Sequence, residues 1–330
     1  MTGMQIAFDL LRILTDGKFH SGTLLAQQLK VSRSSIWKGV NYLRKLEVPI
    51  QAVTSRGYRW MDPPELLNKE TILAHLDPLT ACELPRLDVV NVIPSTNDYL
   101  TQRLPHGIPR GTLCIAEAQT AGKGRMGKTW MSPLGANIYL SLYWKFSNKR
   151  HDLSSLSLVV GLAVLKALAQ IAPLPESVGI KWPNDIWDHT HKLSGILIET
   201  ANNHNNSQVL DVIIGIGLNV QMPDSYHDPL IWTDLKRMWG FTPSRNALVV
   251  GLLNAMVPML HQFEREGFQP FADLWAKFDL LLGKPVQLTT PHQQQVGIAE
   301  GINERGELCV RMGDTLKAIR YGEISVRPEV

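Results

Sequence analysis

Apolar residues recur at helical spacing over residues 4–15 and in two further segments, each preceded by a serine. Ser21 and Ser32 stand where a side-chain oxygen accepts a hydrogen bond from the first turn of a helix, so both are predicted N-caps. Two short strands joined by a turn follow within residues 50–60. Three helices and a hairpin predict a winged helix-turn-helix over residues 1–64.

The middle of the chain mixes strand-like and helix-like patterns. A segment over residues 156–170 is apolar on nearly all sides and is predicted to be a buried helix. The other predicted elements are strands at 87–93, 137–144, 195–200 and 209–220, and helices at 245–266 and 270–278. This mixture predicts one mixed α/β sheet with helices packed on it, over residues 65–279.

The pattern changes again beyond Gly283, where five short strands are separated by polar turns. They predict a small β-barrel over residues 280–330. Asp62, Pro63 and Pro64 predict a stiff linker after the first domain. The expected fold class is therefore multidomain α+β: a winged helix-turn-helix, a central mixed α/β domain and a C-terminal small β-barrel.

Composition narrows the classes of protein that fit. Hydrophobic residues make up 44% and charged residues 19% of the 330 residues, as in globular proteins. The longest apolar run, residues 158–165, is too short to cross a bilayer, and the first residues do not resemble a signal peptide. Three scattered cysteines predict reduced thiols. We therefore expect a cytoplasmic protein with no membrane partner.

Charge is uneven along the chain. Residues 1–64 carry nine Lys and Arg against four Asp and Glu, a net charge of +5, whereas the remainder sums to −2. A basic winged helix on a near-neutral body indicates a DNA partner for this module. The candidate DNA-binding residues lie on the third helix and on the wing: Ser32, Arg33, Ser34, Lys38, Arg44, Arg56 and Arg59. The alternative is a basic, solvated domain that regulates nothing or only docks on the body.

A glycine-rich cationic loop, residues 122–130, is the main candidate for chemistry. Its letters match the P-loop pattern G-x-x-x-x-G-K-[ST]. A P-loop must begin a helix, however, and here Pro133 and Gly135 follow at once and a strand is predicted over residues 137–144. The loop therefore joins two strands, where its backbone N–H groups and basic side chains can still close on a phosphate.

Five blocks resemble the motifs of biotin protein ligases, in the order of that family. The loop at residues 122–130 resembles the family's G-R-G-R-x-G-x-x-W, and the other blocks are residues 132–139, 181–185, 192–199 and 215–219. The resemblance covers essentially the whole chain, including a winged helix found only in bifunctional members that also repress biotin synthesis. It implies an ATP-dependent ligase that forms biotinyl-5′-AMP and transfers biotin to a lysine of the biotin carboxyl carrier protein of acetyl-CoA carboxylase.

The resemblance also implies which residues bind biotin. Ser95, Thr96 and Asn97 fit an ordinary helix N-cap, but in this family the triplet hydrogen-bonds the ureido ring, with its two N–H donors and one carbonyl. Lys192 resembles the lysine that holds the biotin carboxylate. The full set implied for biotin is Ser95, Thr96, Asn97, Gln119, Lys123, Gly124, Arg125, Lys192 and Gly195.

For ATP and the adenylate, the resemblance implies cations and an aromatic ring. Lys181 matches the lysine that faces the α-phosphate, and Trp232 ends a segment, residues 223–232, that resembles the family's mobile loop. Trp130 and Trp232 each have a core-anchor alternative. The implied set is Lys123, Arg125, Lys128, Trp130, Lys181, Asn184, Asn219 and Trp232, with Lys181, Arg125 and Lys192 as the catalytic candidates. Mg²⁺ is expected to arrive with ATP, helped by Asp185.

The implied partners are the carrier protein, operator DNA and, once the adenylate is bound, a second copy of the chain. The adenylate would serve as both intermediate and corepressor. Three alternatives stay open: a lipoate-type ligase, a ligase with a non-functional DNA-binding domain, and a transcription factor that only senses biotin. The presence of both Lys181 and Lys192 argues against the last.

Two positions depart from the family's loop. Lys123 stands where the family usually has Arg, so a bidentate donor becomes a point charge. Met126 stands where bifunctional members often have Arg. Because ordering of the loop is expected to slow escape of the adenylate, these departures predict faster release than from the family's usual bacterial repressors.

Overall fold

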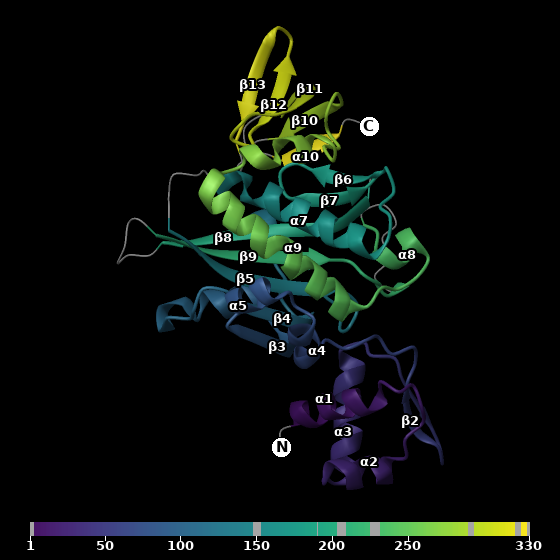
Figure 1. The fold of residues 1–330 in the computed structure, drawn as a ribbon. Helices are drawn as coiled ribbons and strands as arrows, with labels where there is room; N and C mark the ends of the chain where they lie inside the picture. The colour runs from purple at the N-terminus through teal and green to yellow at the C-terminus, as the bar shows by residue number, and fades with distance from the viewer. Residues whose placement is uncertain are drawn as a thin grey trace.

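The computed structural model describes residues 3–147, 153–189, 191–202, 209–224, 232–289, 294–320 and 325–328. Figure 1 shows three parts in a row, with the winged helix at one end and the C-terminal sheet at the other. The fold class expected from the sequence is confirmed, and the domain limits at residues 64 and 279 stay predictions.

The N-terminal part contains α1 (Gly3–Leu14), α2 (Gly22–Leu29), α3 (Arg33–Lys45), β1 (Ile50–Val53) and β2 (Gly57–Trp60). Both predicted caps are present. Ser21 Oγ accepts from Leu24 N and Ser32 Oγ from Ser35 N, each at 3.1 Å. The strands pair antiparallel as the wing, and the helices bury their apolar faces in a core of their own.

The central part is one seven-stranded sheet in the order β3-β4-β5-β9-β8-β7-β6. Its strands are β3 (Arg86–Ile93), β4 (Thr112–Gln119), β5 (Ile138–Phe146), β6 (Val178–Lys181), β7 (Asp185–Asp188), β8 (His191–Asn202) and β9 (Leu210–Leu218). Only the β3–β4 pair is parallel among these strands. The sheet is therefore mixed, as the sequence predicts.

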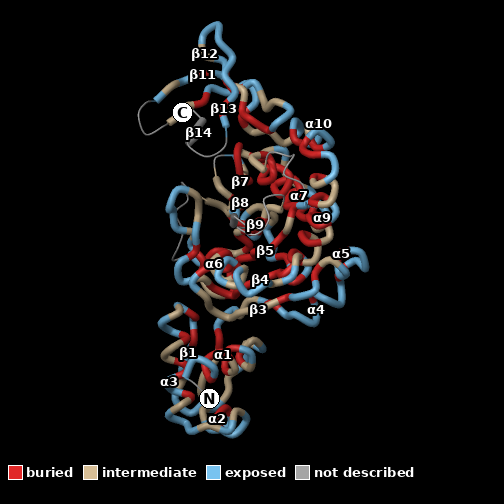
Figure 2. The backbone as a smooth tube through the Cα atoms, turned by 90° about the vertical axis from the view of Figure 1, so that its left-hand side faces the viewer, coloured by how far each residue is buried: buried red, intermediate tan, exposed pale blue. Residues whose placement is uncertain are grey.

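Alternation along the strands gives this sheet two different faces. Even-numbered positions of β5 and β9, such as Leu140 and Ile216, pack in the main core under α7 (Leu156–Ile171) and α9 (Arg245–Glu266), which lie together across one face (Figure 1). Odd-numbered positions such as Tyr143 and Ile213 pack against the short α6 (Thr96–Thr101) on the other. Figure 2 shows how heavily α7 and the inner strands are buried. The second face carries the site described below.

The remaining helices border this sheet. They are α4 (Lys69–Ala74), α5 (Pro78–Glu83), α8 (Leu235–Trp239) and α10 (Ala272–Ala276), with 3-10 turns at Leu104–His106, Arg125–Gly127, Leu153–Ser155 and Gln269–Phe271. Leu153–Ile171 and Arg245–Glu266 are long and apolar enough to cross a membrane by length and composition, but most of each is buried inside the protein. We read both as core helices.

The C-terminal part is a five-stranded antiparallel sheet in the order β13-β12-β11-β10-β14. Its strands are β10 (Pro285–Thr289), β11 (Gln294–Ile302), β12 (Leu308–Met312), β13 (Thr315–Ile319) and β14 (Ser325–Pro328). Trp182 Nε1 donates to Gly306 O at 2.9 Å, across the junction with the central part. This sheet therefore packs directly beside the predicted Lys-Trp-Pro-Asn-Asp motif.

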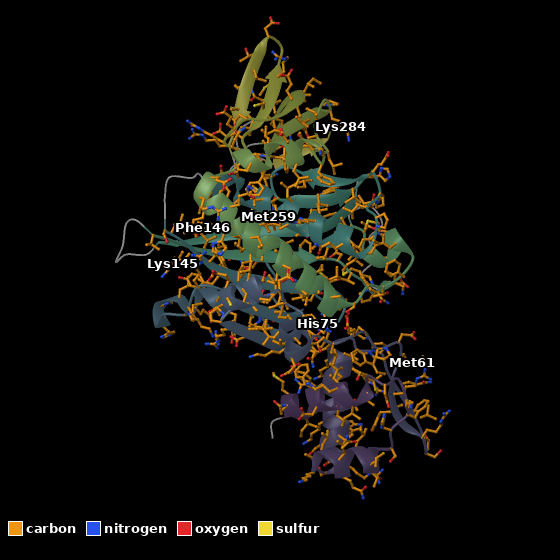
Figure 3. The ribbon with its side chains drawn as sticks, in the orientation of Figure 1. Met61, His75, Lys145, Phe146, Met259 and Lys284 are labelled. Atoms are coloured by element: carbon orange, nitrogen blue, oxygen red, sulfur yellow. The ribbon has the colours of Figure 1, made fainter. Side chains whose placement is uncertain are left out.

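The winged helix is also packed against the central part. Leu134 and Val92 contact the N-terminal core, and a Cβ added to Gly135 would lie 2.5 Å from Pro64 Cγ. Figure 3 labels Met61 and His75, which lie on either side of this junction. The linker is thus held against the segment that follows the glycine-rich loop.

A buried ion pair fixes the start of the central part. Arg245 Nη1 lies 2.7 Å from Glu117 Oε2, and both side chains are almost fully buried. Arg245 also donates to the Glu65 carbonyl at 2.8 Å, while the Glu65 carboxylate accepts from Arg245 N at 2.6 Å. The chain directly after the linker is therefore joined to α9 and to β4.

Candidate functional site

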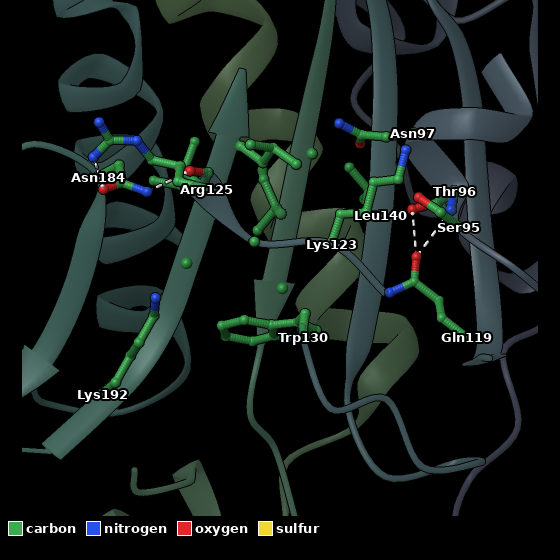
Figure 4. Close-up of a pocket in the computed structure, with 17 residues that line it drawn as sticks. Ser95, Thr96, Asn97, Gln119, Lys123, Arg125, Trp130, Leu140, Asn184 and Lys192 are labelled. Carbon is green, nitrogen blue, oxygen red and sulfur yellow. Dashed lines mark hydrogen bonds between the residues drawn. The ribbon is translucent and has the colours of Figure 1, made fainter. Parts of the chain in front are cut away.

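A pocket opens on the face of the sheet opposite α7 and α9, beneath the glycine-rich loop and beside the start of α6 (Figure 4). Its lining includes all nine residues predicted for biotin. The lining residues are Ser95, Thr96, Asn97, Gln119, Lys123, Gly124, Arg125, Trp130, Leu140, Asn184, Lys192, Gly195, Ile196, Leu197, Gly215, Ile216 and Gly217. The structure thus brings together segments that lie far apart in the sequence.

Glycines make room for the floor of this pocket. Gly195 and Gly217 are cross-strand partners on β8 and β9. A Cβ added to Gly217 would lie 2.3 Å from Trp130 Cε2, and one added to Gly195 would lie 2.9 Å from Trp130 Cζ3. The indole of Trp130 therefore lies directly on the glycine pair. Its Nε1 is buried and has no hydrogen-bond partner among the described residues.

A chain of hydrogen bonds runs along one end of the pocket. Gln119 Oε1 accepts from Thr96 N at 2.9 Å and from Thr96 Oγ1 at 3.1 Å, and Gln119 Nε2 donates to Ser132 Oγ at 3.0 Å. Ser141 Oγ lies 2.7 Å from Thr96 Oγ1 and 2.5 Å from Asn97 Oδ1. Thr96, Asn97 and Ser141 are buried, so the side chains at this end are neutral hydrogen-bonding groups shielded from water.

The glycine-rich loop is held at two points. Lys123 Nζ lies 2.5 Å from Asp98 Oδ1, and Arg125 Nη1 donates to Asn184 Oδ1 at 3.0 Å. The hydrogen bond to Asp98 raises the pKa of Lys123, so this lysine stays charged. The loop contains only the 3-10 turn Arg125–Gly127 and no long helix, as expected from the sequence, and therefore cannot be a P-loop. Met126, with φ 54°, is 64% exposed.

The opposite end of the pocket is cationic. Figure 4 shows Lys192, Arg125 and Asn184 on one side of Trp130, and Ser95, Thr96 and Asn97 on the other. Lys192 Nζ lies 2.7 Å from Asp185 Oδ1 and 5.2 Å from the centre of the Trp130 ring. The pocket therefore suits a ligand with a neutral hydrogen-bonding head, a middle part that packs on an indole, and an anionic tail.

Four residues predicted for ATP or the adenylate lie outside this lining. Lys181 Nζ lies 3.9 Å from the centre of the Trp187 ring. Lys128 is exposed, and Asn219 Nδ2 donates to Thr233 O at 3.0 Å. Trp232 forms an isolated bridge with Lys192 and lies under the guanidinium of Arg237. Their roles stay predictions. The predicted mobile loop lies largely outside the described residues, at 225–231.

Metal-binding side chains are not clustered in the part of the chain that the structure describes. There, no group of three or more His, Cys, Asp and Glu side chains is arranged to hold a metal ion. Asp185 is a hard oxygen donor beside Asn184, at the cationic end of the pocket. Such a carboxylate fits Mg²⁺ that is held mainly by phosphates and water, with one or two protein ligands.

The predicted DNA-binding residues follow α3 and the wing. Arg33, Ser34 and Lys38 are exposed, whereas Ser32 Oγ is engaged as the helix cap. Arg44 donates to Ile50 O at 3.1 Å, so it also ties α3 to the wing. The guanidinium carbons of Arg56 and Arg59 lie 4.3 and 5.8 Å from the centre of the Phe19 ring.

Four residues at the pocket and on the DNA-binding surface were not predicted from the sequence as site residues. Trp37, four residues after Arg33 on α3, is 58% exposed. Ser141, Glu199 and Gly215 meet Asn97 in the pocket. The signal for the last three was the period-2 alternation of their strands, which places odd-numbered residues on the pocket face. Nothing in the sequence tells which of the two faces holds the pocket.

The fold and the pocket define a helix-turn-helix module of the DNA-binding class, joined to a mixed sheet with a ligand pocket. Three families match along the chain: an HTH domain at residues 7–59, the Biotin/lipoate A/B protein ligase family at 89–219, and the Biotin protein ligase C terminal domain at 281–327. The matched regions coincide with the three parts of the fold.

Two relatives of similar length align with nearly the whole chain. The chain is 35% identical to the bifunctional ligase/repressor BirA of Escherichia coli, over 99% of both chains, and 30% identical to that of Bacillus subtilis, over 96% of this chain and 98% of the other. The structure of biotin protein ligase from Aquifex aeolicus in complex with biotin and ATP is similar, with a TM-score of 0.65 and 28% identity over 74% of this chain and all of that one. The chain belongs to the biotin protein ligase family, and its full length matches the bifunctional ligase/repressors.

Proposed function

We propose that this protein activates biotin with ATP and transfers it to a lysine of a biotin carboxyl carrier protein, and that it represses biotin-synthesis genes. The observation that carries the ligase function is the polarity of the pocket. The neutral hydrogen-bonding side chains of Thr96 and Asn97 at one end complement a ureido ring, and Lys192 at the other end complements a carboxylate. Trp130 packs between the two ends (Figure 4).

The reaction has two half-reactions. A carboxylate oxygen of biotin attacks the α-phosphorus of ATP, the bond to the bridging oxygen breaks, and pyrophosphate leaves. The amine of the acceptor lysine then attacks the carbonyl carbon of biotinyl-5′-AMP, loses a proton, and AMP leaves. Neither step needs a protein nucleophile, so catalysis consists mainly of positioning and of neutralising charge.

The protein's own residues supply that positioning. Lys192 aligns the biotin carboxylate, and Arg125, held by Asn184, faces the phosphates from the loop. Lys181, whose ammonium lies 3.9 Å from the centre of the Trp187 ring, neutralises the charge that grows on the α-phosphate. Lys123, Lys128, Asn219 and Trp232 complete the adenylate site. Asp185 would contribute one oxygen ligand to Mg²⁺, which would neutralise charge on the ATP phosphates when bound.

Repression uses the other end of the molecule. Exposed Arg33, Ser34 and Lys38 on α3 face base edges and phosphates, and Arg56 on the wing contacts the backbone. The exposed indole of Trp37 lies on the same helix and adds an apolar surface of the kind that contacts thymine methyl groups. The adenylate acts as corepressor in the cytoplasm, and the adenylate-bound chain binds its operator as a homodimer.

Adenylate formation is tested by pyrophosphate exchange into ATP, with biotin and lipoate offered singly and together. Exchange that requires biotin and is not inhibited by lipoate supports the proposal. Exchange that requires lipoate would instead identify a lipoate-type ligase. Biotin binding without any exchange would leave only a biotin-sensing transcription factor.

Repression is tested by a gel shift on DNA upstream of biotin-synthesis genes, with biotin plus Mg-ATP, with each alone and with neither. A shift that needs both ligands supports an adenylate corepressor. A shift independent of both would mean constitutive DNA binding, and no shift would mean a ligase with a non-functional DNA-binding domain. Sedimentation with and without the ligands tests the homodimer.

A further inference from the structure

Glu199, on β8, reaches the end of the pocket that Thr96 and Asn97 form. Its carboxylate Oε2 accepts a hydrogen bond from Asn97 Nδ2 at 2.7 Å. The contact joins residues 102 positions apart, on elements that meet only through the tertiary fold. Glu199 shares the pocket face of β8 with Gly195 and Leu197, because side chains two residues apart point to the same side of a strand.

This contact decides which way the amide of Asn97 points. An ionised carboxylate only accepts hydrogen bonds, so the atom that faces Glu199 must be the NH₂ group. Asn97 Oδ1 then faces the Ser141 hydroxyl, 2.5 Å away. On the third side, a Cβ added to Gly215 would lie 2.3 Å from Oδ1, so glycine is required there for the amide to fit.

Only part of the Asn97 amide is left for a ligand. One N–H and one carbonyl lone pair are used inside the protein, and one of each remains for the pocket. A flipped amide would bring its oxygen against the carboxylate, which is repulsive, whereas the Ser141 hydroxyl can donate or accept and so fits either orientation. The orientation presented to the ligand is therefore set by Glu199.

We infer that Glu199 is a positioning residue for biotin that acts through Asn97, by holding its amide in the orientation that the ureido ring recognises. The inference rests on the proposed function, because it assigns the ureido ring to this end of the pocket. The carboxylate itself does not contact the ligand. The hydrogen bond to Asp98 raises the pKa of Lys123, and the negative charge of Glu199 raises it further.

The test measures biotin affinity of the full chain by calorimetry without ATP, and KM for ATP in pyrophosphate exchange. Glu199→Ala and Glu199→Leu, which differ in volume, both remove the acceptor and are expected to raise Kd for biotin about tenfold or more, with KM for ATP nearly unchanged. Glu199→Gln keeps an acceptor oxygen and is expected to stay within about threefold of the wild type.

A double-mutant cycle separates positioning from a general structural effect. If Glu199 acts through Asn97, adding Glu199→Ala to Asn97→Ala changes Kd by less than about twofold. Two results would overturn the inference and leave the proposed function standing. One is that the increases in Kd caused by Asn97→Ala and Glu199→Ala multiply in the double variant. The other is a Kd for Glu199→Ala within about twofold of the wild type. A wild-type chain that binds no biotin would overturn the proposed function and the inference with it.

Discussion

Lys192 Nζ lies 2.7 Å from Asp185 Oδ1, so the cation proposed to hold the biotin carboxylate is held by a carboxylate of the protein. The two residues stand on neighbouring strands, β8 and β7, and both side chains are about a quarter exposed or less. A ligand carboxylate bound to Lys192 would compete with Asp185 for this ammonium. Asp185 would then be available as an oxygen ligand for Mg²⁺ that arrives with ATP.

Replacement of Lys192 should therefore separate folding from chemistry. Lys192→Ala is expected to lower the rate of adenylate formation by about 10²-fold or more, because charge stabilisation at the reacting carboxylate is lost. Pyrophosphate exchange measures the loss, and circular dichroism checks the fold. Lys166→Ala, on the exposed side of α7, is the matched control and should leave the exchange rate unchanged. Exchange at the wild-type rate in Lys192→Ala would remove this lysine from the site.

The glycine pair under Trp130 predicts a steric effect. Gly217→Ala places a methyl group 2.3 Å from the indole, so either Trp130 or the strand must move. Overpacking of this size costs about 2 kcal/mol. If that cost falls on the position of the indole on which biotin packs, the binding free energy weakens by the same amount, which corresponds to a rise of about 30-fold in Kd for biotin. Gly251→Ala on α9 meets atoms no closer than 3.6 Å and serves as the control. Equal affinities of the two variants would contradict the proposed position of the ligand on Trp130.

The exposed loop residue Met126 bears on how long the adenylate stays bound. Met126→Arg adds a guanidinium to a loop that already carries Lys123 and Arg125, and gives it a further donor for phosphate. We expect adenylate release to become about threefold to tenfold slower, measured in a single-turnover assay. Comparable release rates from the variant and the wild type would refute the prediction that this departure from the family's loop speeds release.

The two arginines of α3 should differ in what they affect. Arg33→Ala is expected to weaken operator binding by about 1–3 kcal/mol, to change its salt dependence, and to leave ligation intact. Arg44→Ala should in addition lower the melting temperature, since its guanidinium donates to Ile50 O and ties the helix to the wing. Gel shifts, carrier biotinylation and thermal unfolding measure the three effects. Loss of both activities in Arg33→Ala would show that the two functions are not separable.

Local signals in the sequence were sufficient for much of this fold. Ser21, Ser32 and Ser95 were predicted to cap helices, and each accepts a backbone N–H three residues on. Capping depends on a few consecutive residues, so it can be predicted without knowledge of the tertiary structure. The same holds for β5 and β9, which are predicted as strands at residues 137–144 and 209–220.

Contacts between distant segments could not be predicted in this way. The pairing of Glu199 with Asn97 and that of Arg245 with Glu117 depend on how the sheet is ordered, and no local pattern marks either carboxylate. For Lys181, the resemblance implies a position facing phosphate, which stays a prediction. The structure adds a contact that no local pattern marks, between its ammonium and the ring of Trp187.

The close fit of Pro64 against Gly135, with Leu134 in the N-terminal core, joins the stability of two domains. Unfolding of the winged helix would expose Leu134, four residues after the glycine-rich loop, and Val92, three residues before Ser95, to water. A mutation that unfolds the first 64 residues is therefore felt by the ligase as well. In this chain the stability of the winged helix and that of the ligase domain are therefore coupled through one shared apolar contact.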